Sequence, residues 1–207
     1  MGIRGLDRGE SAALVIHECQ NGMVSPAIAS NAGLAANAAG RGVVARIAAL
    51  AGVCRELGVP VVHSTIEPRP DGVGSDSSCL LLGALMKKGQ VVAGKPAAEI
   101  HPDLAPQPGD IRIRRVHGLT PFHGTELEAY LRERGVRTVV LAGVSSDVGI
   151  PGAALEAVNR GFRVVVPEDC IAGSSQDAHD WQVAHTLPLL ATVGSADAVA
   201  AVLRART

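Results

Sequence analysis

Aromatic and charged residues are scarce in this sequence. Only 2% of its 207 residues are Phe, Trp or Tyr, and 19% are charged. So few aromatic rings leave no stacking platform for single-stranded nucleic acid. The formal net charge of -1 also gives no electrostatic reason to bind nucleic acid or an anionic membrane. We therefore expect neither of these as a partner.

Paired cysteines and long apolar runs are lacking as well. None of the four cysteines belongs to a CxxC pair or shows metal-ligand spacing, so the sequence predicts free thiols, no metal site and no cofactor. They are Cys19, Cys54, Cys79 and Cys170. The N-terminal stretch lacks the apolar region of a signal peptide, and no apolar run is long enough to span a membrane. We expect a cytoplasmic protein.

What the sequence does contain is a regular alternation of short apolar runs and amphipathic stretches. Strands that alternate with helices predict a parallel sheet covered on both faces. We predict one α/β domain over residues 1–207, a three-layer sandwich whose Rossmann-like, parallel six-stranded sheet has helices on both faces. The predicted strands are residues 12–16, 59–64, 110–116, 138–142, 162–167 and 191–193.

Polar residues gather where these predicted strands end. In open parallel sheets, ligands bind outside the carboxyl ends of the strands. That rule selects Glu18, a Pro- and Gly-rich loop at residues 66–78, Arg115 with His117, and the segment 145–149. Small molecules are therefore the expected partners.

The segment 138–162 forms a predicted strand, turn and helix. A β-branched apolar run is followed by a turn, and the helix has Pro151 near its first turn and Gly161 just past its last. A side chain at position 149 would stand at the N-terminus of this helix. There, free N–H groups and the helix dipole lower the pKa of a thiol and stabilise an oxyanion. The residue at this position is Gly149.

This segment resembles the isochorismatase-like (cysteine hydrolase) superfamily. In that superfamily an apolar strand is followed by Gly-Val, a small polar pair, a variable residue, Val and the catalytic Cys. Gly143 to Val148 keep the register, and Gly149 takes the place of the cysteine. The resemblance implies that the peptide between Val144 and Ser145 is cis. It also implies that the backbone N–H groups of Ser145 and Gly149 form an oxyanion hole.

The predicted acid of the site is Glu18. The run from Ile16 to Gln20 resembles the family motif in which an acid, usually Asp, ends the first strand, and His17 also precedes the acid in isochorismatases. A partly buried carboxylate can serve as a general acid. Regular pleating would put His17 and Cys19 on the opposite side of the strand from Glu18. A turn cap or an ion pair with an arginine is the structural alternative for Glu18.

The predicted cation of the site is Arg115, with Arg114 as the competing assignment. The segment from 110 to 125 resembles the family's second motif, which has a Lys at the strand end and a following Phe. Arginine holds carboxylates but does not shuttle protons. The resemblance implies catalytic positions at Glu18, Arg115 and Gly149. It also implies substrate-binding positions at Ser145, Phe122 and His117.

Three functions remain open at this point. The chain could be a hydrolase without a cysteine nucleophile, acting on a vinyl ether of a small carboxylated metabolite, as isochorismatases do. It could be an inactive relative that serves as a binding or assembly module. It could also be an amidase that uses Cys170 or an activated water. Relatives commonly assemble, so the resemblance implies a homodimer or homotetramer.

Overall fold

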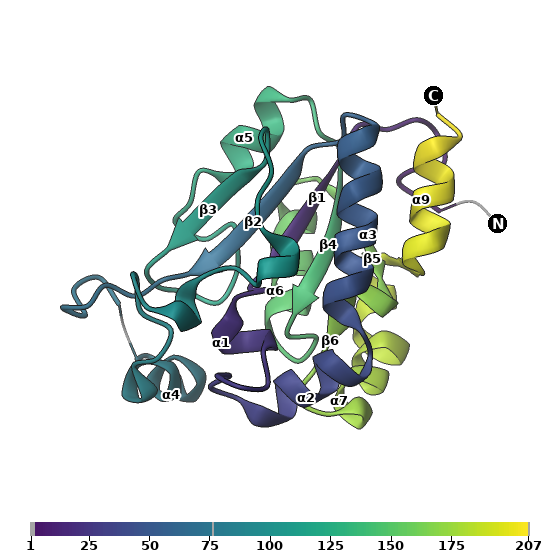
Figure 1. Ribbon diagram of the computed structural model, residues 1–207. Helices are drawn as coiled ribbons and strands as arrows, with labels where there is room; N and C mark the ends of the chain where they lie inside the picture. The colour runs from purple at the N-terminus through teal and green to yellow at the C-terminus, as the bar shows by residue number, and fades with distance from the viewer. Residues whose placement is uncertain (1–2, 76, 207) are drawn as a thin grey trace.

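The computed structural model describes residues 3–75 and 77–206. Its centre is a twisted sheet in the order β3-β2-β1-β4-β5-β7, with β6 paired to β4, and every pairing between strands is parallel (Figure 1). The strands are β1 Ala12–His17, β2 Val61–Ile66, β3 Ile111–Arg115, β4 Thr138–Val144, β5 Arg163–Pro167, β6 Ile171–Ala172 and β7 Thr192–Gly194.

Helices cover both faces of this sheet. On one face α1, α2, α3 and α9 pack over Leu14 and Ile16 of β1, and on the other face α5, α6 and α8 pack over Ala13 and Val15. The helices are α1 Asn21–Val24, α2 Ala32–Gly40, α3 Val43–Glu56, α4 Leu80–Lys88, α5 Leu127–Glu133, α6 Gly149–Asn159, α7 Gln176–Trp181, α8 Leu187–Leu190 and α9 Ala196–Arg204. The predicted three-layer α/β architecture is confirmed.

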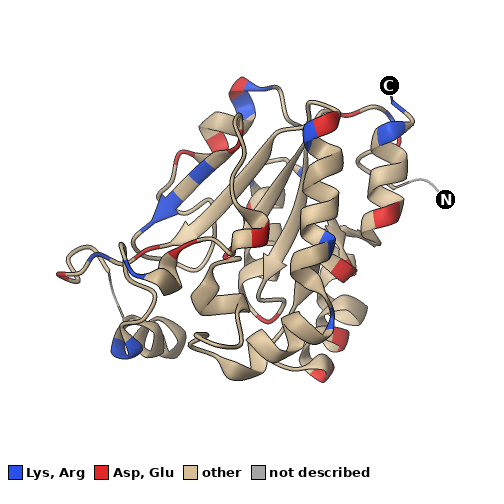
Figure 2. Cartoon of the chain, in the orientation of Figure 1, with Lys and Arg blue, Asp and Glu red and all other residues tan. Residues whose placement is uncertain are grey.

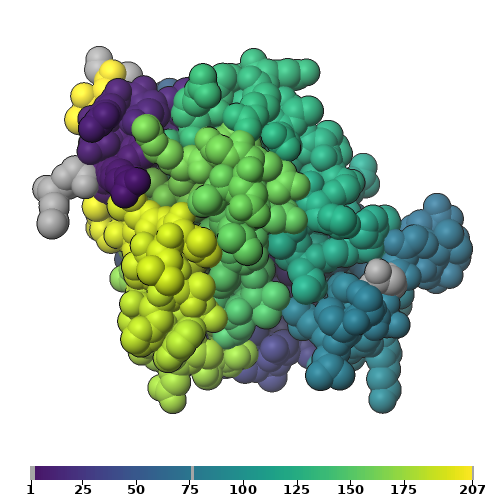
Figure 3. All heavy atoms as spheres, turned by 180° about the vertical axis from the view of Figure 1, so that it is seen from behind, coloured from purple at the N-terminus to yellow at the C-terminus, as the bar shows by residue number. Residues whose placement is uncertain are grey.

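The central strands are apolar because both of their faces are covered. All residues of β1, β2 and β4 are buried. Charged residues follow the same division (Figure 2). The middle of the sheet carries none, and they lie on β3, on the loops and on the outer faces of the helices. From behind, segments from the C-terminal half of the chain cover most of the sheet, and the segment near residue 70 projects from the body (Figure 3).

Some predicted elements differ from the structure. The sheet has a further strand, β6, which spans only Ile171–Ala172 and is too short to produce a periodic signal. The helical segment from Gln176 to Leu190 is divided by one π-helical turn at Gln182–Thr186, just before Pro188. Within the described residues, no single helix is long and apolar enough to cross a membrane. Helices α2 and α3 reach that length and apolar content only when they are counted together, and the chain bends by 60° between them.

The order of the strands places the site. The chain runs outward from β1 through β2 to β3, and then returns to add β4 on the other side of β1. Ligands bind at such a reversal, outside the carboxyl ends of the strands. Ile16 lies beside Ala142 and His17 beside Gly143, so the residues after β1 and those after β4 meet at this point.

Candidate active site

The acid selected from the sequence, Glu18, turns the chain sharply at the end of β1. Its backbone has φ +52°, the left-handed conformation that non-glycine residues rarely adopt. Its N–H donates to the carbonyl of Ser64 at 2.8 Å. This turn ends the alternation of side chains between the two faces of β1. His17 faces the α6 side as predicted, but Cys19 lies in the same core cluster as Ile16, on the opposite side from the one that pleating predicts.

Arg115 lies directly behind Glu18. Its side chain is 1% exposed, and its guanidinium pairs with the Glu18 carboxylate. Its second terminal nitrogen donates to the carbonyl of Gly118 at 2.6 Å. Arg114 is exposed, so geometry selects Arg115 as the cation beside the acid. The ion pair with an arginine, the structural alternative for Glu18, is therefore present.

The turn between β4 and α6 forms the second side of the site. The peptide between Val144 and Ser145 is cis. The Ser145 carbonyl accepts from the N–H of Ile150 at 2.9 Å, and the Ser146 N–H donates to Ala172 of β6 at 2.8 Å. A carboxylate oxygen of Asp147 accepts from the N–H of Ser174 at 2.7 Å. The turn is therefore fixed by bonds to α6, to β6 and to the segment after β6.

The space for a side chain at position 149 is filled by His17. A Cβ atom on Gly149 would lie 2.9 Å from both Cδ2 and Nε2 of the His17 ring, and 3.2 Å from the carbonyl oxygen of Val144. Distances below 3 Å are essentially never seen for a real Cβ. Neither residue lines the cavity described below. The space beside position 149 is thus packed with imidazole.

The His17 ring is wholly buried. Desolvation lowers the pKa of His17 from 6.5 to about 4, while Glu18 raises it, Arg115 lowers it, and the backbone of Leu119 raises it. Neither ring nitrogen has a hydrogen-bond partner among the described residues. Nε2 is 3.8 Å from the nearer Glu18 carboxylate oxygen. At neutral pH the ring is uncharged and lies against the acid of the site.

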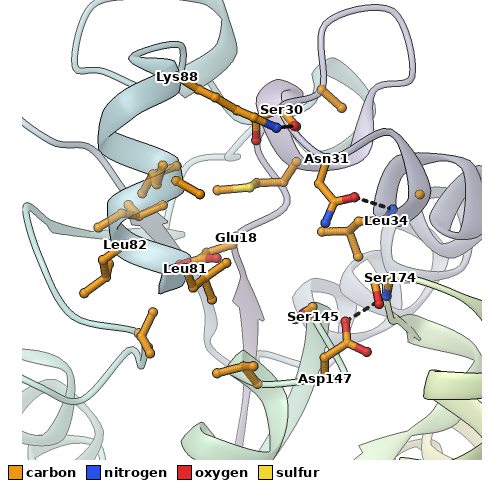
Figure 4. Close-up of a pocket in the computed structure, with 18 of the residues that line it drawn as sticks. Glu18, Ser30, Asn31, Leu34, Leu81, Leu82, Lys88, Ser145, Asp147 and Ser174 are labelled. Atoms are coloured by element: carbon orange, nitrogen blue, oxygen red, sulfur yellow. Dashed lines mark hydrogen bonds between the residues drawn. The ribbon is translucent and has the colours of Figure 1, made fainter. Parts of the chain in front are cut away.

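A cavity of about 800 Å³ opens over Glu18 and Ser145 (Figure 4). Its apolar lining comes from leucines and an alanine of α4 and from Met23, Leu34 and Ile66. Its polar lining comes from the inner acid, from the β4–α6 turn and from the rim. These polar residues are Glu18, Ser30, Asn31, Lys88, Ser145, Asp147 and Ser174. The cavity is largely apolar, with a small polar group at the carboxyl ends of β1 and β4.

No cysteine of the described chain lines this cavity. Burial raises the pKa of Cys19 and of Cys54 to about 12, and it raises the pKa of Cys170 further still. Cys79, before α4, is only partly buried and lies outside the lining. The described residues also hold no cluster of three or more His, Cys, Asp or Glu that could bind a metal ion.

Two residues predicted to bind substrate lie away from the cavity. Phe122 is 3% exposed and stacks on Phe162 in the core between the sheet and α5–α6. The ring of His117 packs edge-on against that of His123, with centroids 5.5 Å apart, and the next residues, Gly118 and Leu119, contribute to the lining instead. Of the predicted positions, Glu18 and Ser145 reach the cavity directly.

Sequence reasoning missed Asp147, Lys88 and the leucines of α4. Asp147 stands in the variable position of the family pattern, so the motif gave it no weight. The run Leu80-Leu81-Leu82 with Leu85 predicts an apolar helix face, and two lysines follow it. Nothing in that run indicates that the face is turned toward a site whose acid lies far away in the sequence.

Comparisons with known proteins find relatives over most of the chain. Residues 12–198 match the family model described as the isochorismatase domain. Maleamate amidohydrolase of Pseudomonas putida is 32% identical over 142 residues, which cover 67% of this chain and 65% of that relative. Enterobactin synthase component B of Escherichia coli K12 is 27% identical over 170 residues, which cover 82% of this chain and 55% of that relative. The chain thus spans less than two thirds of the length of these curated relatives.

A solved structure is also similar over almost the whole chain. The isochorismatase family protein from Desulfovibrio vulgaris Hildenborough superposes with a TM-score of 0.81 at 28% identity, and the match covers 95% of this chain and 100% of that one. A cysteine hydrolase from Pseudomonas syringae shares the fold at 20% identity, with the same TM-score.

Proposed function

The chain belongs to the isochorismatase family, and from that membership we propose that it is a hydrolase that cleaves its substrate without a covalent thiol intermediate. One observation carries the proposal. The cavity presents the carboxylate of Glu18, whereas the position of the family's nucleophile is glycine and its space is filled by His17. Without a thiol, proton transfer and addition of water are the chemistry left to this site.

A vinyl ether of a carboxylated metabolite fits such a site. Glu18, once protonated, gives its proton to the terminal carbon of the enol ether, and an oxocarbenium ion forms at the ether carbon. Water adds to that carbon and returns a proton to Glu18. The hemiketal then separates into an alcohol and a keto acid.

Arg115 supports this chemistry from behind the cavity wall. It does not line the cavity, so its contact is with Glu18 and not with bound substrate. The guanidinium fixes the direction of the carboxylate and compensates its charge between turnovers. At the start of α6 the N–H of Ile150 is already bonded to the Ser145 carbonyl and Pro151 has no N–H, so this helix does not supply a row of free N–H groups to a developing anion.

The proposal is tested by following two products. Isochorismate is the probe for vinyl ether cleavage, followed by release of pyruvate, and maleamate is the probe for amide cleavage, followed by release of ammonia. We expect pyruvate release that Glu18→Gln abolishes and that Glu18→Asp partly retains. Full turnover in Glu18→Gln would remove Glu18 from the reaction. Ammonia release without pyruvate release would assign amide cleavage by an activated water.

The Glu18–Arg115 pair also favours a second candidate, a binding module without turnover. Each partner satisfies the other's charge in the free protein, and no cysteine of the described residues lines the cavity. A module of this kind would be stabilised by carboxylated metabolites that it does not convert, since a ligand that binds only the folded state raises the Tm. Stabilisation without any product would favour this candidate.

A further inference from the structure

Helix α4 presents a row of leucines to the cavity. Leu81, Leu82 and Leu85 all line it. Leu82 is the buried residue of this helix, while Leu81 remains 49% exposed. Figure 4 shows α4 along one side of the cavity, with Leu81 and Leu82 among the residues drawn there. An apolar group held in the cavity would remove this exposed leucine surface from water.

The size of the cavity also bears on the ligand. A volume of about 800 Å³ lies in the range of roughly 300–1,000 Å³ that is typical of sites for drug-sized ligands. A metabolite as small as maleamate would leave most of the leucine wall uncovered. Met23, Leu34 and Ile66 add further apolar surface to the lining, so the uncovered volume suits a hydrocarbon body.

One cation stands on the rim of this cavity. Lys88, the last residue of α4, is the single Lys or Arg in the described lining, and its ammonium group donates to the carbonyl of Ser30. No carboxylate of the described residues lies within 4.0 Å of that ammonium group. Lys88 and Asp147 lie on opposite sides of the cavity, with Glu18 between them (Figure 4).

We propose that the substrate is an elongated amphipathic acid. Its reacting group lies at Glu18 and Ser145, its apolar body lies against the leucines of α4, and its anionic group lies at Lys88. Asp147, which has no cationic partner within 4.0 Å among the described residues, makes its side of the cavity unfavourable for a permanent anion, and the uncompensated ammonium of Lys88 makes the rim favourable for one. This inference rests on the proposed function for the place of the reacting group.

Binding of a chain-length series tests the apolar body. The probes are the monoamides of unbranched dicarboxylic acids, from succinamic acid to the monoamide of dodecanedioic acid; their uncharged amide end stands in for the reacting group, and their Kd values are measured by calorimetry. We expect affinity to rise by about fourfold per added methylene until the cavity is spanned. Leu81→Ala should weaken the long probes and leave the shortest one unchanged. Leu80→Ala is the matched control, because Leu80 is 94% exposed and lies outside the lining.

Two neighbouring lysines test the anion site. Lys88→Gln should weaken the acids by about two- to fivefold, the size expected of an exposed ion pair, and it should leave their methyl esters unaffected. The effect should shrink at high salt. Lys87→Gln, one residue earlier on the same helix and outside the lining, should change neither set of affinities.

The outcomes separate this inference from the proposed function. Affinities that do not vary with chain length, or equal effects of the two lysine variants, would overturn the elongated acid even if pyruvate is released from isochorismate. A chain-length dependence with a specific Lys88 effect would support it even if none of the probes is hydrolysed, because binding is measured without turnover.

Discussion

The imidazole of His17 fills the space in which a side chain at position 149 would stand. The two residues are far apart in the sequence, and they meet because β1 and β4 are neighbours and end at the same edge of the sheet. This contact is a structural reason for a residue without a side chain at position 149. A side chain at this position and the His17 ring in its observed place do not fit together, so any residue larger than glycine at position 149 requires the imidazole to move.

Gly149→Ala tests this contact most simply. The added methyl group would lie 2.9 Å from the ring of His17, and overpacking of this kind costs about 1–3 kcal/mol of unfolding free energy. Urea unfolding measures the loss. Gly52→Ala in α3 is the matched control, because nothing lies within 4 Å of its Cβ position. It should gain up to about 1 kcal/mol from helix propensity.

A double variant completes that test. In His17→Ala the space beside Gly149 is open, so Gly149→Ala should cost much less there than in the native chain, and the two changes should be strongly non-additive. Additive losses would mean that the ring does not set the identity of residue 149. Gly149→Cys should follow the same rule, with a thiol that iodoacetamide reaches only when His17 is also removed.

Thiol labelling tests whether the site works without a cysteine thiol. In the folded protein at neutral pH, maleimide should modify Cys79 alone, because Cys19, Cys54 and Cys170 are buried and burial raises the pKa of each thiol. Mass spectrometry should find one label before unfolding and four after it. Labelling should leave turnover and ligand binding intact. Loss of turnover that tracks modification of Cys170 would restore the thiol mechanism.

Much of the fold could be predicted from the sequence, because buried central strands have an unmistakable composition. The runs in β1 and β4 are apolar on both faces, and Glu18 and Ser145 follow from the rule that sites lie at the ends of such strands. The small helix α2 is rich in Ala, Gly and Asn, and its weak periodicity gave no signal. Lys88 and the contact of His17 with Gly149 depend on three-dimensional neighbours, and a single sequence does not contain that information.

The ion pair of Glu18 and Arg115 predicts a large effect of charge removal. Arg115→Met leaves the Glu18 carboxylate without its partner, and breaking a largely buried pair costs about 3 kcal/mol or more. Thermal or urea unfolding measures this loss. The double variant Glu18→Gln/Arg115→Met should recover part of it, since no uncompensated charge remains. Arg69→Met, which breaks an exposed pair with Asp71, should have no measurable effect; a similar loss there would contradict the assignment.

The buried His17 ring predicts a pH dependence of stability. Its pKa is lowered from 6.5 to about 4, so between these values the unfolded chain binds a proton that the folded chain does not. Stability is therefore fully present above pH 6.5 and falls as the pH drops toward 4. The contribution of this one group is about 3 kcal/mol, at 1.36 kcal/mol per pKa unit.

His17→Gln isolates that contribution. His63 and His179 also have lowered pKa values, so the native protein and the variant should both lose stability in acid, and only the difference between them reports on His17. As the pH falls from 6.5 to 4, we expect the native protein to lose unfolding free energy relative to the variant, because the glutamine has no proton to gain. Parallel curves over this range would mean that the ring is charged in the folded protein. Glu18 would then lie against an imidazolium, and the site would hold a second cation beside Arg115.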